Sequence, residues 1–511
     1  MSLIRQRTDL LNFNYMTRKI ASGCWFISII LLLNEKITGP LVSPEPEIEL
    51  NSFKTHLNKR LPVLMKKYKI PGVSLAIIND GQVAWYNSYG YADLKTGRKM
   101  TNDTYCRVES ISKSITAWGI MQLVEQGVLD PTQSVQIYFK NWRIPESEYS
   151  EENVTVRALL SHCSGFPLGT IGARYSPFEN LPSLEVSLSE EAILKQEPGL
   201  SFAYSNTGFN LLELIIEEVT DRDFAEFMKN EVLIPLGMYN SSFTWSEDFN
   251  SEVPTGYDLK GNPIPLYIYP GKASGGLFAS VVDIATFVAA GMTNFSNTGN
   301  KVLNIQSINE LYTPLVDIPG YLGLAFECYG LGHFIEYLSN GNIAVSHGGQ
   351  GTGWMTHFHS VPTTGDGIVI LTNSQRSWPL ISYILTDWAE WNGFSRIGMS
   401  KIILGHKILR ASIVLLVLVL SVQLWRLTKG IYSGKRNLKL PSKSSRFISF
   451  MQFCIFGIII SGLIWAATRE YLFVSSVFPV VSKWLGHSLL IAAIILLLSA
   501  LFPRNRNNHA F

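Results

Sequence analysis

The residues whose types and spacing are best suited to chemistry are Ser110 and Lys113, which stand three positions apart. In a helix, side chains at that spacing lie on one face, a turn apart. A lysine amine that has been removed from water can take the proton of such a serine and make it a nucleophile. No other serine in the chain has a lysine at this offset. The pair therefore predicts acyl transfer through a lysine-activated serine.

Two residues further along the chain can complete that chemistry. Tyr204 comes just before an apolar helical stretch. A tyrosine beside a cation can ionise more easily than its usual pKa of about 10 allows, which would make it a proton shuttle. Asn206 carries an amide that can hold a substrate carbonyl and the lysine. The local sequence leaves two other interpretations open, a packed aromatic side chain for Tyr204 and a helix N-cap for Asn206.

The segment from Val345 to Gly351 combines a histidine with glycines in a β-prone run. Glycine in a strand marks a place where another backbone or a ligand comes close, so we expect a substrate to pair along this edge at Gly349. The N–H groups of Gln350 and Ser110 can then form an oxyanion hole. His347 can act on a leaving group or a carboxylate, although a lone histidine is more often simply a hydrogen-bonded polar residue.

These groups need a helix that begins at the serine. An extended segment, Thr104–Val108, leads to Ser110, and apolar residues on nearly all sides predict a buried helix over Ile111–Gln126 that ends at Gly127. A serine at a helix start is often an N-cap. The same position also offers free backbone N–H groups to a developing oxyanion, which favours a nucleophile there.

Strand patterns occupy both ends of the middle region. Asp80-Gly81 lies between the β-prone runs Val73–Ile78 and Gln82–Tyr86, which predicts a hairpin. Strands are also expected at Asn342–Ser346, Met355–Ser360 and Gly367–Thr372, and helices at Glu45–Lys67, Phe209–Val219, Asp223–Val232, Ser280–Met292 and Leu380–Trp391. Strands at both ends with helices between them predict an α+β fold, in which the terminal segments share one antiparallel sheet flanked by helices.

Composition indicates a membrane protein with a globular middle. The 511 residues are 47% apolar with a formal net charge of +2, and the apolar residues gather at the two ends. The near-balanced charge does not suggest nucleic acid as a partner. Five cysteines at irregular spacing predict neither a disulfide framework nor a metal site. Residues 1–39, in which Arg18 and Lys19 precede the apolar run Ile20–Leu33, are predicted to be a signal peptide or an N-terminal membrane anchor.

The C-terminal part contains three apolar runs, Ile408–Trp425, Phe447–Ala467 and Trp484–Phe502. Each has about the 20 residues that a membrane span needs. The loop Arg426–Arg446 carries seven basic residues and no acidic one, so the positive-inside rule makes it cytoplasmic. We therefore expect an extracytoplasmic domain over residues 40–401 and a membrane domain of three transmembrane helices over residues 402–511. The protein would be multi-pass in the cell membrane, with the lipid bilayer as a partner.

At the residues that carry the chemistry, the chain resembles the penicillin-recognising serine hydrolases, specifically their class C β-lactamase-like branch. That branch includes β-lactamases, D-alanyl-D-alanine peptidases, D-amino-acid amidases and carboxylesterases. Its Ser-x-x-Lys, Tyr-x-Asn and Lys/His-x-Gly motifs match Ser110/Lys113, Tyr204/Asn206 and His347/Gly349. Supporting stretches are Ile70–Val73, Leu159–Gly165, Pro235–Met238 and Ser274–Leu277, so the resemblance covers about Leu61 to Asn373. It implies a β-lactamase/transpeptidase-like fold, no metal, no cofactor, and a small-molecule or peptide substrate, for which the cell wall is one candidate source.

The chain departs from the β-lactamase pattern at His347, where those enzymes carry lysine. A fixed ammonium binds a substrate carboxylate, whereas a histidine is largely neutral near pH 7 and binds it less well. The sequence thus predicts a membrane-anchored serine hydrolase that acts through an acyl-enzyme on an ester, amide or peptide outside the cytoplasm. Its pH profile should show a group near the histidine pKa of about 6.5. The alternatives are a sensor that is acylated once and signals through the spans, and an inactive binding module.

Overall fold

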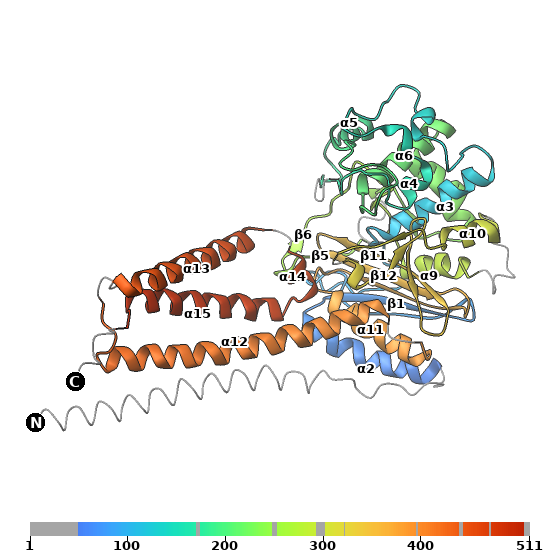
Figure 1. Cartoon of the computed structure of the whole chain (residues 1–511). Helices are drawn as coiled ribbons and strands as arrows, with labels where there is room; N and C mark the ends of the chain where they lie inside the picture. The colour runs from blue at the N-terminus through green and yellow to red at the C-terminus, as the bar shows by residue number, and fades with distance from the viewer. Residues whose placement is uncertain are drawn as a thin grey trace, which may run out of the picture. The chain divides into compact units, whose positions relative to one another are not determined.

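The computed structural model describes residues 50–169, 174–247, 253–292, 302–320, 322–394, 397–438, 443–469 and 472–504. The chain divides into a larger unit, Val42–Ile403, and a smaller unit that includes Leu404–Phe511 (Figure 1). The predicted N-terminal apolar segment lies outside the described residues, as do the first five residues of the helix expected at Glu45–Lys67.

The larger unit is built on an antiparallel sheet with the strand order β2-β1-β13-β12-β11-β10-β9-β8. The strands are β1 (Gly72–Asn79), β2 (Gln82–Gly90), β8 (Val316–Asp317), β9 (Cys328–Tyr329), β10 (Phe334–Tyr337), β11 (Ile343–Gly351), β12 (Trp354–Val361) and β13 (Asp366–Thr372). Val73 of β1 lies opposite Thr372 of β13, so the two ends of the unit share the sheet as predicted. The predicted hairpin is confirmed, because Asp80 and Gly81 turn the chain with φ angles of 50° and 69°.

Helices cover both faces of this sheet (Figure 1). Successive residues of a strand point to opposite faces, and β12 shows which helix lies on which face. Phe358 packs against Phe287 of α9 (Val281–Ala290), whereas its neighbour His359 packs against Trp388 of α11 (Trp378–Trp391). α11 in turn packs on α2 (Leu50–Tyr68), where Phe53 stacks on Trp391 with ring centroids 4.4 Å apart.

The chain between β2 and β8 supplies most of the helices. Besides α9, they are α3 (Ile111–Glu125), α4 (Val156–Leu160), α5 (Leu184–Glu191), α6 (Asn206–Thr220), α7 (Phe224–Met228), α8 (Ile234–Leu236) and α10 (Ile305–Leu311), with shorter 3-10 turns at Val135–Tyr138 and Glu151–Asn153. Two further 3-10 turns, Leu322–Leu324 and Gly398–Ser400, come after β8. A small sheet joins β3 (Cys106–Arg107), β7 (Phe278–Ala279) and β4 (Ser241–Ser242), and β5 (Gly256–Tyr257) pairs with β6 (Pro263–Ile264). Twelve of the fifteen residues of α3 are buried, which confirms the prediction of a helix enclosed on nearly all sides.

Three differences from the predicted elements have local causes. The helix expected at Asp223–Val232 is α7, which continues into a π-helical turn at Lys229–Leu233. β11 runs on through its glycines to Gly351, because glycine tolerates the extended conformation that its neighbours need. α6 begins at Asn206, since Ser205 caps it by accepting a hydrogen bond from the N–H of Gly208.

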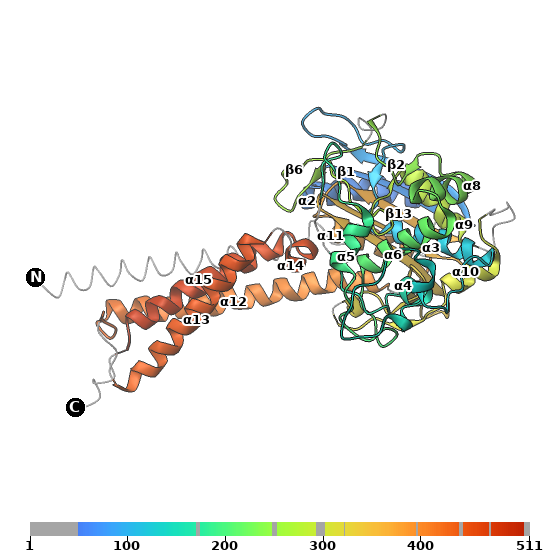
Figure 2. The same cartoon turned by 90° about the horizontal axis from the view of Figure 1, so that it is seen from above.

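The part of the smaller unit that the structure describes is built of helices (Figure 2). α12 (Lys401–Tyr432), α13 (Lys443–Thr468) and α15 (Val481–Leu501) contain three segments long and apolar enough to cross a membrane, and α14 (Phe473–Val477) precedes α15. The segments are Gly398–Tyr432, Arg446–Thr468 and Val481–Leu501, each with a mean hydropathy of 2.2. They contain the three predicted runs almost completely. Apolar side chains such as Phe447 and Ile458 are 73% and 71% exposed, which suits a lipid environment better than water.

Cysteine plays no cross-linking role in the part of the chain that the structure describes. Cys106, Cys163, Cys328 and Cys454 are all free thiols there. Cys106 is fully enclosed, and burial raises the pKa of its thiol to about 12, so it is an unreactive core residue.

Candidate active site

The candidate nucleophile stands at the first turn of α3, directly after a strained residue. Glu109 has a φ of 52°, in the left-handed region, and Ser110 follows it at the N-cap position. The Ser110 side chain makes no capping hydrogen bond, so its hydroxyl is not used to satisfy the helix start. The hydroxyl of Ser112 instead donates to the carbonyl of Glu109 at 2.6 Å and accepts from the N–H of Leu277 at 3.1 Å. Ser112 is therefore held structurally, while Ser110 is left available.

Lys113 reaches the serine from one turn further along α3. Its Nζ lies 3.2 Å from Ser110 Oγ, 2.7 Å from Asn206 Oδ1 and 2.6 Å from the carbonyl oxygen of Ser274. The side chain is fully buried, and burial lowers the pKa of Lys113 to about 7, although nearby Glu109 acts in the raising direction. A neutral amine has two N–H groups for the two carbonyl oxygens and one lone pair left for the serine proton. The geometry thus fits a base aimed at Ser110.

Tyr204 lies over the same lysine. The Lys113 Nζ is 5.0 Å from the centre of its ring, and the ring of His162 lies 4.2 Å away on centroids. Burial raises the pKa of Tyr204 above its usual range, although a hydrogen bond with Ser110 acts to lower it. This corrects the expectation that the neighbouring cation would make Tyr204 ionise easily, because desolvation of the phenolate outweighs a lysine that is itself half neutral. In the resting site Tyr204 is a protonated hydroxyl beside Ser110.

Asn206 and His162 are held by the start of α6. Since Ser205 is the N-cap, the amide of Asn206 is not needed for capping and its oxygen accepts from Lys113. The His162 Nδ1 accepts from the N–H of Ser205 at 3.1 Å, and burial lowers the pKa of His162 well below its usual range. His162 is therefore a neutral support under Tyr204.

The glycine-bearing part of β11 forms one wall of the site. β10 pairs with β11 only as far as Ser346, whereas β12 follows the other edge to Gly351. From His347 onward, no strand of the described chain pairs with the first edge. A Cβ on Gly349 would lie 2.1 Å from the carbonyl oxygen of Val108, so this strand passes directly against the segment that precedes Ser110. Gln350 is exposed, and its side-chain oxygen accepts from Trp378 Nε1 at 2.8 Å.

His347 is fully buried, and both of its ring nitrogens are engaged. Nδ1 lies 2.9 Å from the carbonyl oxygen of Gly348, and Nε2 lies 3.1 Å from the hydroxyl of Tyr329. Because a carbonyl only accepts, Nδ1 carries the proton and Nε2 accepts from the tyrosine. Burial lowers the pKa of His347 well below its usual range, and Lys113 lowers it further. This corrects the expectation of a histidine titrating near 6.5; the group near neutrality is Lys113.

Sequence reasoning missed Glu109, which lies in a buried cluster directly behind the nucleophile. Its carboxylate accepts from Arg107 Nε at 3.0 Å, from the hydroxyl of Tyr267 at 3.1 Å and from the hydroxyl of Tyr269 at 3.0 Å. The role of the Ser274 carbonyl was likewise not predicted, although the family resemblance includes the stretch Ser274–Leu277. An ionisable residue directly before a candidate nucleophile was the one available sequence signal for Glu109.

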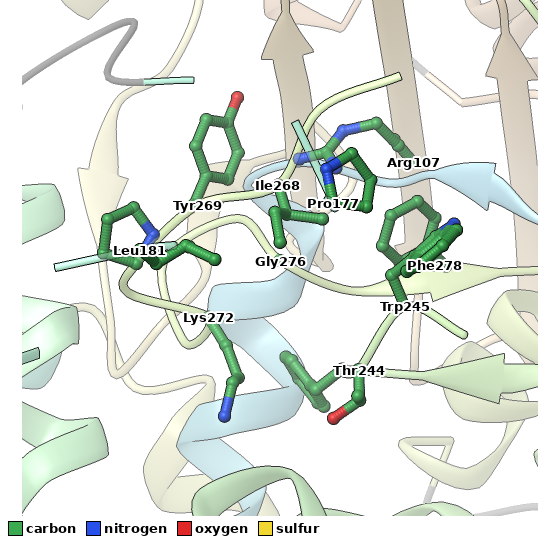
Figure 3. Close-up of a pocket in the computed structure, with 12 residues that line it drawn as sticks. Arg107, Pro177, Leu181, Thr244, Trp245, Ile268, Tyr269, Lys272, Gly276 and Phe278 are labelled. Carbon is green, nitrogen blue, oxygen red and sulfur yellow. The ribbon is translucent and has the colours of Figure 1, made fainter. Parts of the chain in front are cut away.

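A cavity of about 280 Å³ is lined in part by residues of this cluster (Figure 3). Arg107, Tyr269 and Phe278 form part of its wall, and Lys272 and Gly276 bring it close to the segment that contains Ser274. Among the described residues, no group of three or more His, Cys, Asp or Glu side chains could hold a metal ion. The groups that the site offers for chemistry are thus the hydroxyls, the amine, the amide and the backbone N–H groups.

The region that matches known proteins contains all the candidate site residues. The Beta-lactamase family model matches residues 57–381. Protein flp of Staphylococcus aureus (strain MRSA252) is 24% identical over 409 residues, which is 76% of this chain and 78% of that protein. Penicillin-binding protein 4* of Bacillus subtilis (strain 168) is 31% identical over 188 residues, which is 36% of this chain and only 40% of that protein.

Solved structures with the same fold include two kinds of protein. The octameric penicillin-binding protein homologue from Pyrococcus abyssi is 29% identical with a TM-score of 0.53, over 63% of this chain and 73% of that one. A class C beta-lactamase is 21% identical with a TM-score of 0.54, over 64% of this chain and 93% of that one. At that identity, the second likeness shows the fold alone.

Proposed function

The chain belongs to the beta-lactamase family of serine hydrolases, and from that premise we propose that it hydrolyses a neutral ester or amide through an acyl-enzyme on Ser110. The observation that carries the proposal is the contact set of Lys113. A buried amine with a pKa of about 7, two carbonyl acceptors and one serine oxygen is suited to act as a base near neutral pH.

In the proposed acylation, Ser110 Oγ attacks the substrate carbonyl as its proton passes to Lys113 Nζ. The carbonyl oxygen becomes an oxyanion held by the N–H groups of Ser110 and Gln350. The hydroxyl of Tyr204, which is hydrogen-bonded to Ser110, gives its proton to the leaving group and is replenished from the lysine. A water then attacks the acyl-enzyme by the reverse path, so proton and serine are restored.

The remaining site residues orient the substrate. The amide of Asn206 serves both Lys113 and the substrate. Its oxygen accepts from Lys113 at 2.7 Å, and its N–H groups donate to the substrate. The edge of β11 from His347 to Gly351 pairs with the substrate, and Gly349 lets this strand pass close to the segment that precedes Ser110. His347 positions the distal part as a neutral ring rather than as a cation. Because this wall carries no fixed positive charge, the proposal names neutral substrates over carboxylate-bearing ones.

The test of this proposal is labelling and turnover of the full-length protein in detergent. A fluorophosphonate probe should label the native protein, and Ser110→Ala should lose the label while its melting temperature is kept. Ser114→Ala is the matched control, because it removes another hydroxyl of α3, one that donates to the carbonyl of Gly332. Labelling of Ser112 or Ser205, as identified by mass spectrometry, would refute the assignment of the nucleophile. A native protein that stays acylated by a chromogenic ester, without releasing acid, would indicate a sensor instead.

We further propose that the apolar helices hold this domain at the outer face of a membrane. Three segments have the length and hydropathy of spans, and the basic loop Arg426–Arg446 supports a cytoplasmic position for the turn between the first two. A reporter fused after Gly434 should then behave as cytoplasmic and one fused after Asn392 as extracytoplasmic. Both reporters on the same side would overturn this arrangement.

A further inference from the structure

Glu109 is the most constrained ionisable residue next to the proposed nucleophile. The residue is 2% exposed, and both of its carboxylate oxygens receive hydrogen bonds. Arg107 Nε and the Tyr267 hydroxyl donate to Oε1, and the Tyr269 hydroxyl donates to Oε2. A buried carboxylate with a cation and two hydroxyl donors is fixed in place, since losing any one of these partners would leave a charge poorly solvated.

The backbone of Glu109 is fixed as tightly as its side chain. Its φ of 52° is uncommon for a residue with a Cβ and persists only where the surroundings impose it. Its carbonyl oxygen accepts from the N–H of Ser112 at 2.9 Å and from the Ser112 hydroxyl at 2.6 Å. Because a peptide unit is planar and trans, fixing this carbonyl also fixes the direction of the Ser110 N–H. That N–H is one of the two proposed oxyanion donors.

The same side chain contacts the strand that carries the other donor. A Cβ on Gly351 would lie 2.2 Å from Glu109 Oε1, and a Cβ on Gly349 would lie 3.0 Å from Glu109 Cβ. These two glycines flank Gln350, whose N–H is the second donor. Tyr267 strengthens the connection, because its hydroxyl is also 3.1 Å from the carbonyl oxygen of Thr352 at the end of this strand. Glu109 therefore lies between the two donors and contacts the chain on both sides.

Glu109 also acts on the proposed base through its charge. The other titratable groups around Lys113 are Tyr204, which burial keeps protonated, and His162 and His347, which burial keeps neutral. Among the described residues, the charge that acts on this amine is thus that of Glu109. The negative charge of Glu109 favours the ammonium form of Lys113 and opposes the effect of burial.

We propose that Glu109 is a positioning residue, which holds the Ser110 and Gln350 N–H groups at the spacing an oxyanion needs and sets the pH range in which Lys113 is a base. The inference rests on the proposed function, since it assigns a task to a residue behind the proposed nucleophile. Glu109 itself touches neither the substrate nor the transferred proton.

The test compares Glu109→Gln with Asp387→Asn in the full-length protein, by following the rate of fluorophosphonate labelling from pH 5 to pH 9. Glutamine keeps the shape of the side chain and can still accept from Arg107 through its oxygen. Asp387 is a matched control, because it too is a buried carboxylate paired with an arginine, Arg60, but it joins α2 to α11. Both variants lose a buried charge partner, so both are expected to melt earlier.

Glu109→Gln should slow labelling by about 10- to 100-fold, the cost of misplaced reacting groups, and should move the acidic limb of the profile to lower pH. Asp387→Asn should leave the rate and the limb unchanged. An unmoved limb in Glu109→Gln, or an equal loss of rate in both variants, would overturn the inference and leave Glu109 as a core ion pair. Failure of the native protein to be labelled at Ser110 would instead refute the proposed function.

Tyr269→Phe gives a second comparison that does not remove the charge and does not depend on the folding of Glu109→Gln. It removes one of three donors to the carboxylate, so labelling should slow by only a few fold. The acidic limb should remain where it is in the native protein, because Glu109 is still ionised. If the acidic limb shifts as far in Tyr269→Phe as it does in Glu109→Gln, the role given to the charge of Glu109 is wrong.

Discussion

Two groups of buried titratable side chains lie on opposite faces of the central sheet, and only one of them is supplied with partners. On the site face, Lys113 has three polar partners and both ring nitrogens of His347 are engaged. On the face covered by α11, His357 and His359 stack on each other with ring centroids 5.9 Å apart. None of their four nitrogens has a hydrogen-bond partner within the described part of the chain.

The difference shows that burial alone does not make a functional group. Burial lowers the pKa of Lys113, His357 and His359 alike. Around Lys113, however, two fixed carbonyl acceptors orient the amine so that its lone pair faces Ser110. Its lowered pKa then lets it act as a base on that serine. Around the two histidines, Trp378 and Trp388 supply only ring contacts. Their lowered pKa values therefore mean only that protonating them at acidic pH destabilises the folded protein.

The largest effect is expected on the site face, from Lys113→Arg. A guanidinium remains protonated at all accessible pH values and cannot take the serine proton. Loss of a general base typically costs about 10²- to 10⁴-fold, so acylation measured with a chromogenic ester should fall by that amount. In the native protein the rate should rise with pH through about 7, as Lys113 loses its proton. A variant that keeps its rate would show that the partners of Lys113 are structural, like those of Asp387.

The next effect is expected on the opposite face and concerns stability rather than rate. The folded-state pKa of His359 is lowered from its usual value to about 4, so folding favours the neutral ring. Its contribution is therefore complete above the unfolded pKa of about 6.5 and is lost as the pH falls from there towards 4. At full protonation the loss is about 3 kcal/mol for this one residue.

His359→Gln tests this directly, because glutamine is polar and of similar size but does not titrate. The variant should lose less stability than the native protein between pH 6.5 and pH 4, as measured by thermal melting at each pH. The native protein, melted over the same pH range, is the control. Identical acid transitions in the two proteins would mean that the unpartnered histidines do not limit stability.

Sequence could predict the parts of the site that depend on local spacing. Ser110 and Lys113 share a helix face because they are one turn apart, and the hairpin at Asp80 follows from its turn residues. The Glu109 cluster could not be predicted, because Tyr267 and Tyr269 are far away in the chain and no periodicity relates them to it. The protonation of Tyr204 was predicted wrongly for a related reason: sequence shows which charges are near, but not how completely water is excluded.

The smallest effect is expected from His347→Lys, which places a cation where the site face now has a neutral ring. The native wall should favour neutral esters over carboxylate-bearing substrates of the same size, because His347 carries no charge at pH 7. A lysine in this position should raise acylation by the carboxylate substrates about 5- to 10-fold relative to the neutral ones. His347→Gln is the control for the lost imidazole and should leave that ratio near its native value. The native protein could instead hydrolyse a cephalosporin efficiently, with the same ratio of carboxylate to neutral substrates in all three proteins. The substrate carboxylate would then bind away from position 347. The charge at position 347 would then have no influence on which substrates the enzyme prefers.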